Sequence, residues 1–229
     1  MLKATRPVFD FPGLLGVRVH IDSSLFILLF AIMAFGFFRE APLSAAIFCG
    51  MLLLSIYLHE LGHAAGAKLG NVEVKRIVLH GAGGFCQTER TIPRKDLLIV
   101  ACGPLVNLLL WYFSMDWVDG VHAEVAAGRT PPLAAYAWYV YWFGWINLML
   151  LALNMLPVLP MDGGKLLFLA LWYKLPMDAA LKVTGFFGMV VSVLWWPAII
   201  YLFLTTGIIV LFFPSVRENW ERFRGRKAL

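Results

Sequence analysis

Long apolar runs separated by short polar segments dominate the chain, and they predict membrane-spanning helices. About 20 apolar residues cross the hydrocarbon core of a bilayer as a helix. The expected spans lie at about 23–38, 43–65, 97–115, 133–156, 180–196 and 198–213. The first is short and can extend back to Ile21. The last two divide the tract Ala180–Phe213, which is too long for one crossing, at Pro197. We therefore expect an all-α polytopic membrane protein with about six spans, within a range of five to seven.

Two shorter segments have a different character. The apolar run at 166–173 either completes the inner end of the fourth span or lies at the membrane interface. In the segment Val72–Gln87, valines and the run Ile77–Leu79 predict short strands, and three glycines turn the chain between them. We expect a small membrane-associated β hairpin or sheet after the second helix.

Composition supports a membrane protein and argues against nucleic-acid binding. Hydrophobic residues make up 61% of the chain and charged residues 14%, whereas soluble domains average about 45–50% and about 25%. In such a protein the formal charge of +5 reports the orientation of loops, so no nucleic-acid partner is expected. The three cysteines form no CxxC pair, and this spacing argues against a disulfide framework.

The basic residues predict the orientation of the chain in the membrane. With the N-terminus inside, 17 of the 19 Lys and Arg residues lie on the inner side, and only Arg39 and Arg129 lie outside. The positive-inside rule then places both termini in the cytoplasm. It also places the C-terminal end of the second span toward the cytoplasmic side. The whole chain, 1–229, is expected to form a single integral-membrane domain.

The second span ends in the polar sequence HELGH, residues 59–63. Residues four apart share a helix face, so His59 and His63 can bind one ion while Glu60 holds a water on it. This is the HExxH arrangement of zinc peptidases, in which zinc lowers the pKa of its water to about 7 and the glutamate accepts the proton. A chance match on a surface helix is the alternative. Ionisable groups within a span cost roughly 2.5–3.5 kcal/mol each, which favours the functional interpretation.

A catalytic zinc usually has three protein ligands. The extended zincin pattern fails here, because Leu69 stands where the third histidine would be. Glu89 lies among basic residues and is expected in a solvated loop. Asp162 is the better candidate: it lies in NMLPVLPMDGG, residues 154–164, where prolines break the helix and glycines permit close backbone approach. The predicted topology brings it to the same leaflet as HELGH. A helix N-cap is the alternative role for this aspartate.

On these motifs the chain resembles the site-2 protease family of intramembrane zinc metalloproteases. HELGH and NMLPVLPMDGG are similar to the paired signature of that family. GVRVHIDSSLFILL, residues 16–29, resembles the segment that leads into its first span, and ACGPLVN, residues 101–107, resembles its third-span motif. The resemblance covers most of residues 16–164. With no room for an appended PDZ or CBS domain, the chain is expected to be a minimal form.

The resemblance implies a set of site residues. The implied zinc ligands are His59, His63 and Asp162. Glu60 is the implied catalytic base. Asn154 is implied to lie near the reacting carbonyl as a substrate positioner or oxyanion donor, with a helix–helix hydrogen bond as the alternative. Asn107 is expected to serve such helix packing, with Gly103 and Pro104 shaping the third helix.

The implied activity is hydrolysis of peptide bonds in transmembrane segments of single-span membrane proteins, with one Zn²⁺ per chain, as in regulated intramembrane proteolysis. The small sheet is implied to lie beside the active site. An exposed strand edge there could pair with an unwound substrate; a plain connecting hairpin is the equal alternative. The expected partners are these substrates, the lipid bilayer and a regulatory membrane protein. The expected location, in a bacterium, is the inner or cytoplasmic membrane. The competing hypotheses are a non-proteolytic scaffold (pseudoprotease) that binds client helices, and a metal transporter.

Overall fold

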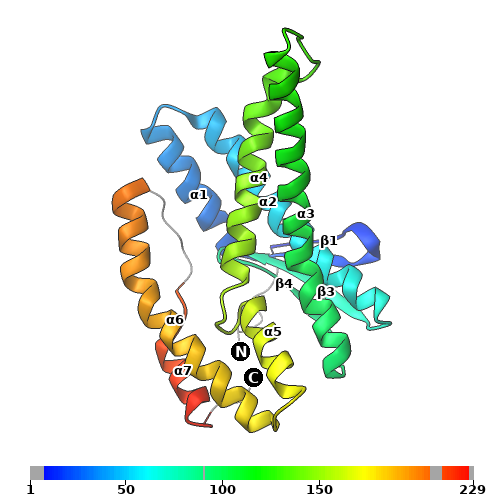
Figure 1. Ribbon diagram of the computed structural model, residues 1–229, viewed down its shortest axis with the longest axis vertical. Coiled ribbons are helices and arrows are strands. Elements are labelled where there is room, and N and C mark those ends of the chain that lie inside the picture. The colour runs from blue at the N-terminus through cyan, green and yellow to red at the C-terminus, as the bar shows by residue number, and fades with distance from the viewer. Residues whose placement is uncertain (1–7, 90, 207–212, 227–229) are drawn as a thin grey trace. The chain divides into compact units, whose positions relative to one another are not determined.

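The computed structural model describes residues 8–89, 91–206 and 213–226. The chain divides into two compact units. The first unit comprises Met1–Arg90 and Cys102–Leu151, and the second comprises Thr91–Ala101 and Ala152–Leu229. The elements, labelled in Figure 1, are β1 (Phe9–Pro12), η1 (Leu14–Gly16), β2 (Arg18–Ile21), α1 (Ser23–Phe38), α2 (Pro42–Leu69), β3 (Val74–His80), β4 (Gly83–Thr88), α3 (Pro93–Ala126), η2 (Ala134–Tyr136), α4 (Ala137–Asn154), α5 (Asp162–Trp172), α6 (Met177–Thr206) and α7 (Val216–Phe223).

Within the described residues, four helical segments are long and apolar enough to cross a membrane. They are Pro42–Leu69, Pro93–Ala126, Ala134–Asn154 and Met177–Leu202. The apolar helix α1 has 16 residues, a length of about 24 Å at 1.5 Å per residue. The chain is an integral multi-pass membrane protein. The predicted fold class, a polytopic α-helical protein with a small sheet after the second helix, is confirmed.

Three predicted boundaries differ from the structure. Pro197 lies inside α6, so the predicted break there is wrong. A proline removes one backbone hydrogen bond, a loss that membrane helices tolerate. The last predicted span falls partly on 207–212, outside the described residues. The run at 166–173 does not complete α4, because it belongs mostly to a separate helix, α5, which begins at Asp162; its position at the membrane interface stays a prediction. Finally, Ile21 lies in β2 and not in α1, whose N-cap is Asp22.

The sheet has four strands in the order β1-β2-β3-β4. The antiparallel pair β3–β4 is the predicted hairpin. Strands β1 and β2 were not predicted; β2 pairs with β3 in parallel, with Val19 opposite Ile77 and Ile21 opposite Leu79. The sheet therefore joins the segment before the first helix to the segment after the second.

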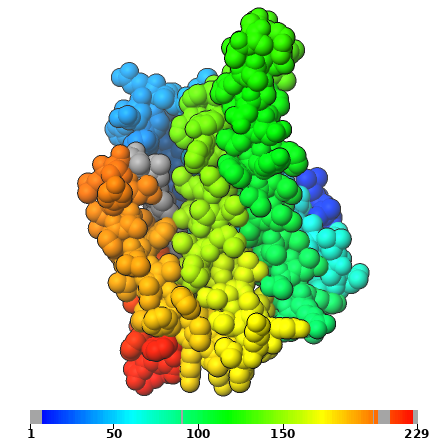
Figure 2. All heavy atoms as spheres, in the orientation of Figure 1, coloured from blue at the N-terminus to red at the C-terminus, as the bar shows by residue number. Residues whose placement is uncertain are grey.

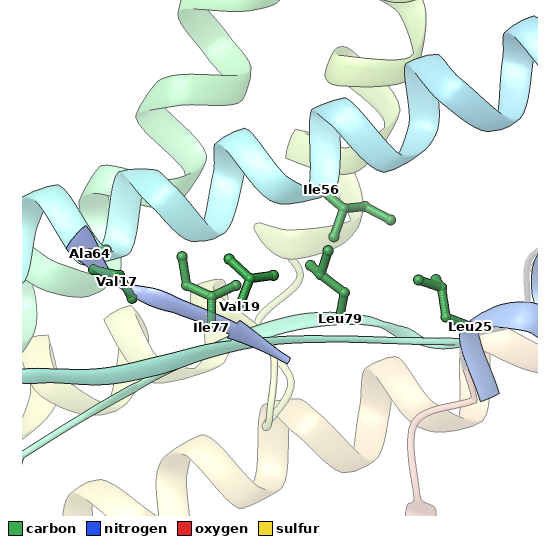
Figure 3. Packing of buried hydrophobic residues seen from close by; sticks show 7 residues of the cluster. All are labelled: Val17, Val19, Leu25, Ile56, Ala64, Ile77 and Leu79. Atoms are coloured by element: carbon green, nitrogen blue, oxygen red, sulfur yellow. The ribbon is translucent and has the colours of Figure 1, made fainter. Parts of the chain in front are cut away.

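One face of the sheet packs on α2 through a cluster of buried hydrophobic residues. Its members are Val17, Val19, Leu25, Ile56, Ala64, Ile77 and Leu79. Figure 3 shows the side chains of Val19, Ile77 and Leu79 directed from the strands toward α2. Full burial of an aliphatic side chain contributes about 1.5–3 kcal/mol. Because Ile56 and Ala64 flank HELGH on α2, this packing holds the sheet beside that motif.

In the second unit, the short helix α7 packs on the N-terminal half of α6, as the red and gold atoms of Figure 2 show. Glycines make the contact close: a Cβ added at Gly185 would lie 2.5 Å from the backbone nitrogen of Phe223. Asn219, fully buried, donates from Nδ2 to Ser192 Oγ at 3.3 Å. Helix α7 is thus packed firmly on α6, the helix that precedes it in the chain.

Candidate metal centre

The two histidines of HELGH lie one turn apart on α2, and the structure brings their Nε2 atoms to 3.1 Å of each other. Both side chains are buried, and their rings are nearly perpendicular, at 88°. Two nitrogen ligands at about 2.0–2.1 Å from one tetrahedral zinc would lie about 3.3 Å apart. The arrangement of His59 and His63 therefore fits a shared zinc ion.

Gly103 of α3 keeps the space beside these two nitrogens open. A Cβ added at Gly103 would lie 2.4 Å from His63 Nε2 and 2.9 Å from His59 Nε2. The helices can approach this closely because Gly62 of α2 faces the backbone of Cys102, whose carbonyl oxygen would be 2.7 Å from a Cβ at Gly62. The glycine in ACGPLVN thus has a direct role at the site: it leaves room where a bound ion would need it.

Glu60 follows His59 on α2 and is also buried. Strand β4 packs against it, since a Cβ at Gly84 would lie 2.7 Å from Glu60 Cγ and 2.8 Å from Oε1. The sheet is therefore in contact with the carboxylate that the motif assigns as the base. A side chain at position 84 would have to displace Glu60.

His59 also has a polar partner on the side away from His63. Its Nδ1 lies 2.5 Å from Oδ1 of Asn107 on α3. Asn107 in turn donates from Nδ2 to Oδ1 of Asn147 on α4, at 2.8 Å, and both asparagines are fully buried. Metal-binding histidines usually donate their second ring N–H to such an acceptor. Asn107 therefore does more than pack helices, and Asn147 is a residue that sequence reasoning missed; its one sequence signal is an amide within an apolar span.

Asp162 lies in the second unit as the first residue of α5, and it is 3% exposed. Lys165 donates from Nζ to its Oδ1 at 3.0 Å. The N-cap of α5 is Met161, so the alternative role of Asp162 as the capping residue does not hold. Asn154, half-buried, ends α4. The roles of Asp162 as third ligand and of Asn154 at the carbonyl stay predictions.

The glycine pair that follows Asp162 allows the close backbone approach expected of it. A Cβ at Gly163 would lie 2.2 Å from the carbonyl oxygen of Met155, and one at Gly164 would lie 2.5 Å from the carbonyl carbon of Val158. Larger residues could not start α5 against this loop. Elsewhere, Glu89 is exposed beside Lys75, at 3.8 Å, in agreement with its expected solvated position.

A buried HExxH pair with the ligand spacing of zinc peptidases thus lies on a helix long enough to cross a membrane. Comparisons with known proteins agree. The model of peptidase family M50 matches residues 120–195. Stage IV sporulation protein FB of Bacillus subtilis is 34% identical over 132 residues, which cover 56% of this chain and 42% of that protein. A protein of Methanocaldococcus jannaschii named as a zinc metalloprotease is 27% identical over 154 residues, which cover 67% and 42%.

Among solved structures, the site-2 protease from Methanocaldococcus jannaschii matches with a TM-score of 0.64 and 20% identity over 96% of each chain. The fold is therefore that of a site-2 protease. The resemblance to the site-2 protease family that the motifs predicted is confirmed by these matches. The chain spans 42% of the length of each of the two curated relatives named above.

Proposed function

We propose that this chain is an intramembrane zinc endopeptidase that hydrolyses peptide bonds in transmembrane segments of single-span membrane proteins. One observation carries the proposal: two buried imidazole nitrogens lie 3.1 Å apart, on a helix long enough to cross a membrane, and Glu60, the residue that follows His59, is also buried. Buried ionisable groups in a span are costly and by default indicate function. The names of relatives as zinc metalloproteases support zinc as the metal.

The proposed zinc ligands are His59, His63 and Asp162. Zinc supplies a water of lowered pKa and polarises the substrate carbonyl. The support for Asp162 is that the residue is only 3% exposed at the start of α5, in the segment whose pattern is similar to the family signature. Two histidines and one carboxylate form a known ligand set of catalytic zinc sites.

In this proposal Glu60 accepts the proton of the attacking water and then delivers it to the leaving amide nitrogen. Its burial and its contact with Gly84 hold the carboxylate in one place. The amide of Asn154 donates a hydrogen bond to the substrate carbonyl oxygen as negative charge develops there.

Strand β4 is the proposed docking edge for the unwound substrate. It is the last strand in the sheet order, so within the described residues one of its edges has no neighbouring strand. A peptide must be extended to be cleaved, and an extended peptide can add to such an edge through main-chain hydrogen bonds. The contact between Gly84 and Glu60 supports a substrate position near the base.

The proposed biological setting is regulated intramembrane proteolysis, with both termini in the cytoplasm. For a bacterial protein the compartment is the inner or cytoplasmic membrane. A membrane partner that restricts substrate access belongs to the same proposal. The basis for the orientation is the asymmetry of Lys and Arg along the sequence.

The experiment uses wild type and Glu60→Gln in liposomes with a panel of single-span reporters whose transmembrane segments carry a helix-weakening glycine pair. We expect the wild type to cut within the span, and Glu60→Gln to keep its zinc and lose cleavage by a factor of 10² or more. Glu89→Gln removes an exposed carboxylate of the same unit and is the matched control. Normal cleavage by Glu60→Gln would overturn the assignment, and capture of reporters without any cleavage would favour the scaffold.

A further inference from the structure

Behind His59, a chain of hydrogen bonds runs through three helices of the first unit. Asn107 Oδ1 faces His59 Nδ1 at 2.5 Å, and Asn107 Nδ2 donates to Asn147 Oδ1 at 2.8 Å. Asn147 Nδ2 donates to Ser55 Oγ on α2 at 3.0 Å, and the Ser55 hydroxyl donates to the carbonyl of Met51 at 2.8 Å. Asn107, Asn147 and Ser55, the polar relay, are each fully buried.

The direction of each hydrogen bond follows from one backbone carbonyl. Asn147 Nδ2 lies 2.8 Å from the carbonyl oxygen of Phe143, one turn earlier on α4. A carbonyl oxygen only accepts, so the amide nitrogen of Asn147 must face it, and the amide oxygen must face Asn107. Asn107 then has to present its own amide nitrogen to Asn147. Its oxygen is left facing His59, where it accepts a hydrogen bond from Nδ1–H.

The direction of these hydrogen bonds determines which ring nitrogen of His59 carries the proton. A neutral imidazole carries one proton, and the nitrogen without the proton is the one that can bind a metal. With the proton held on Nδ1 by Asn107, the lone pair of His59 lies on Nε2. That nitrogen is the one that faces His63 and the space left by Gly103.

We propose that the polar relay fixes the tautomer of His59 that binds metal through Nε2, and that Asn147 is a positioning residue, acting on the site through Asn107 without touching His59. The inference deepens the proposed function, on which it rests only in taking His59 as a metal ligand. Three fully buried polar side chains on three helices would not be needed for packing alone, since apolar side chains could fill the same volume.

The relay can be tested first on the metal-free protein. Nitrogen-15 spectra of protein labelled at its five histidines report which ring nitrogen carries the proton, with His59 assigned from a His59→Gln variant. We expect a single Nδ1–H tautomer in the wild type and a mixture in Asn147→Leu, although Asn107 is still present. Asn147→Asp keeps an acceptor toward Asn107 and is expected to restore the single tautomer.

Metal affinity is the second readout, with Co²⁺ alone as the probe. Loss of a residue that orients a metal ligand typically weakens metal binding 10–100-fold. We expect a loss of that size in Asn107→Leu, a loss of up to about tenfold in Asn147→Leu, and no further loss when the two are combined, because they act in one chain. The control is Thr184→Val on α6, a fully buried hydroxyl that donates only to the carbonyl of Ala180 at 2.9 Å.

Some results would overturn the polar relay, and a different result would overturn the proposed function. An unchanged His59 tautomer and unchanged cobalt affinity in folded Asn147→Leu would overturn the proposal, and so would an equal loss in Thr184→Val. If Asn147→Leu does not fold, Asn147→Asp decides: a mixed tautomer in that variant contradicts the relay. A wild type that binds cobalt through an Nδ1-protonated His59 and cuts no reporter would contradict the proposed function and leave the relay intact.

Discussion

The space beside the two histidine nitrogens depends on Gly103 having no side chain, and Gly103→Ala is the most local perturbation of the centre. The new Cβ would lie 2.4 Å from His63 Nε2 and 2.9 Å from His59 Nε2. Contacts shorter than about 3.4 Å are strained, so both rings or the helix α3 must move. Overpacking by one methyl group typically costs about 1–3 kcal/mol. If the rings move, that cost falls on metal binding and corresponds to about 5- to 160-fold weaker affinity.

The assay is zinc content after metal-replete purification, followed by Co²⁺ titration of the metal-free protein. Gly120→Ala is the matched control, because it places the same methyl on the same helix where a Cβ meets no atom within 4 Å. It should bind metal as the wild type does and gain up to about 1 kcal/mol of helix stability. Wild-type affinity in Gly103→Ala would refute the assignment of this space to the ion.

Three further predictions concern other parts of the fold. Gly84→Val should displace Glu60 from β4, lowering reporter cleavage at least tenfold while zinc content stays unchanged; equal loss of zinc would point to general disruption. Burial lowers the pKa of His80, and the Asp22 carboxylate opposes that shift. Protonation of His80 therefore favours the unfolded state, so the free energy of unfolding is unaffected above about pH 6.5 and decreases as the pH falls below it; His80→Gln should show a weaker pH dependence of unfolding in that range. Pro197→Ala should not lower the unfolding midpoint in detergent, because α6 is already continuous through Pro197.

The close approach of the two histidines could be predicted because their relation is local. A spacing of four residues places His59 and His63 on one helix face whatever the rest of the fold does. The role of Gly163 and Gly164 could be predicted for the same reason. The backbone that approaches them belongs to Met155 and Val158, only a few residues earlier in the chain.

The polar relay could not be predicted, because its members lie on three helices. An asparagine in an apolar span indicates a polar partner, but the partner depends on how the helices rotate and cross. The sequence therefore predicts only a packing role for Asn107, and it does not distinguish Asn147 from any other amide in an apolar span.

Strands β1 and β2 were missed for a related reason. Each has four residues, too few for alternation to be distinctive. They pair with each other, but β2 joins the rest of the sheet only through β3, more than fifty residues later. The break expected at Pro197 failed because the effect of proline on soluble helices was applied to a membrane helix, where the lost hydrogen bond is tolerated.

The measurement that tests the central claim most directly is zinc per chain in the wild type, Glu60→Gln and Asp162→Ala. The account predicts about one zinc in the first two and a strong reduction in the third, because the proposed mechanism has Glu60 activate water without binding the ion and has Asp162 as the third ligand. Full zinc in Asp162→Ala, or no zinc in any of the three after metal-replete preparation, would contradict it.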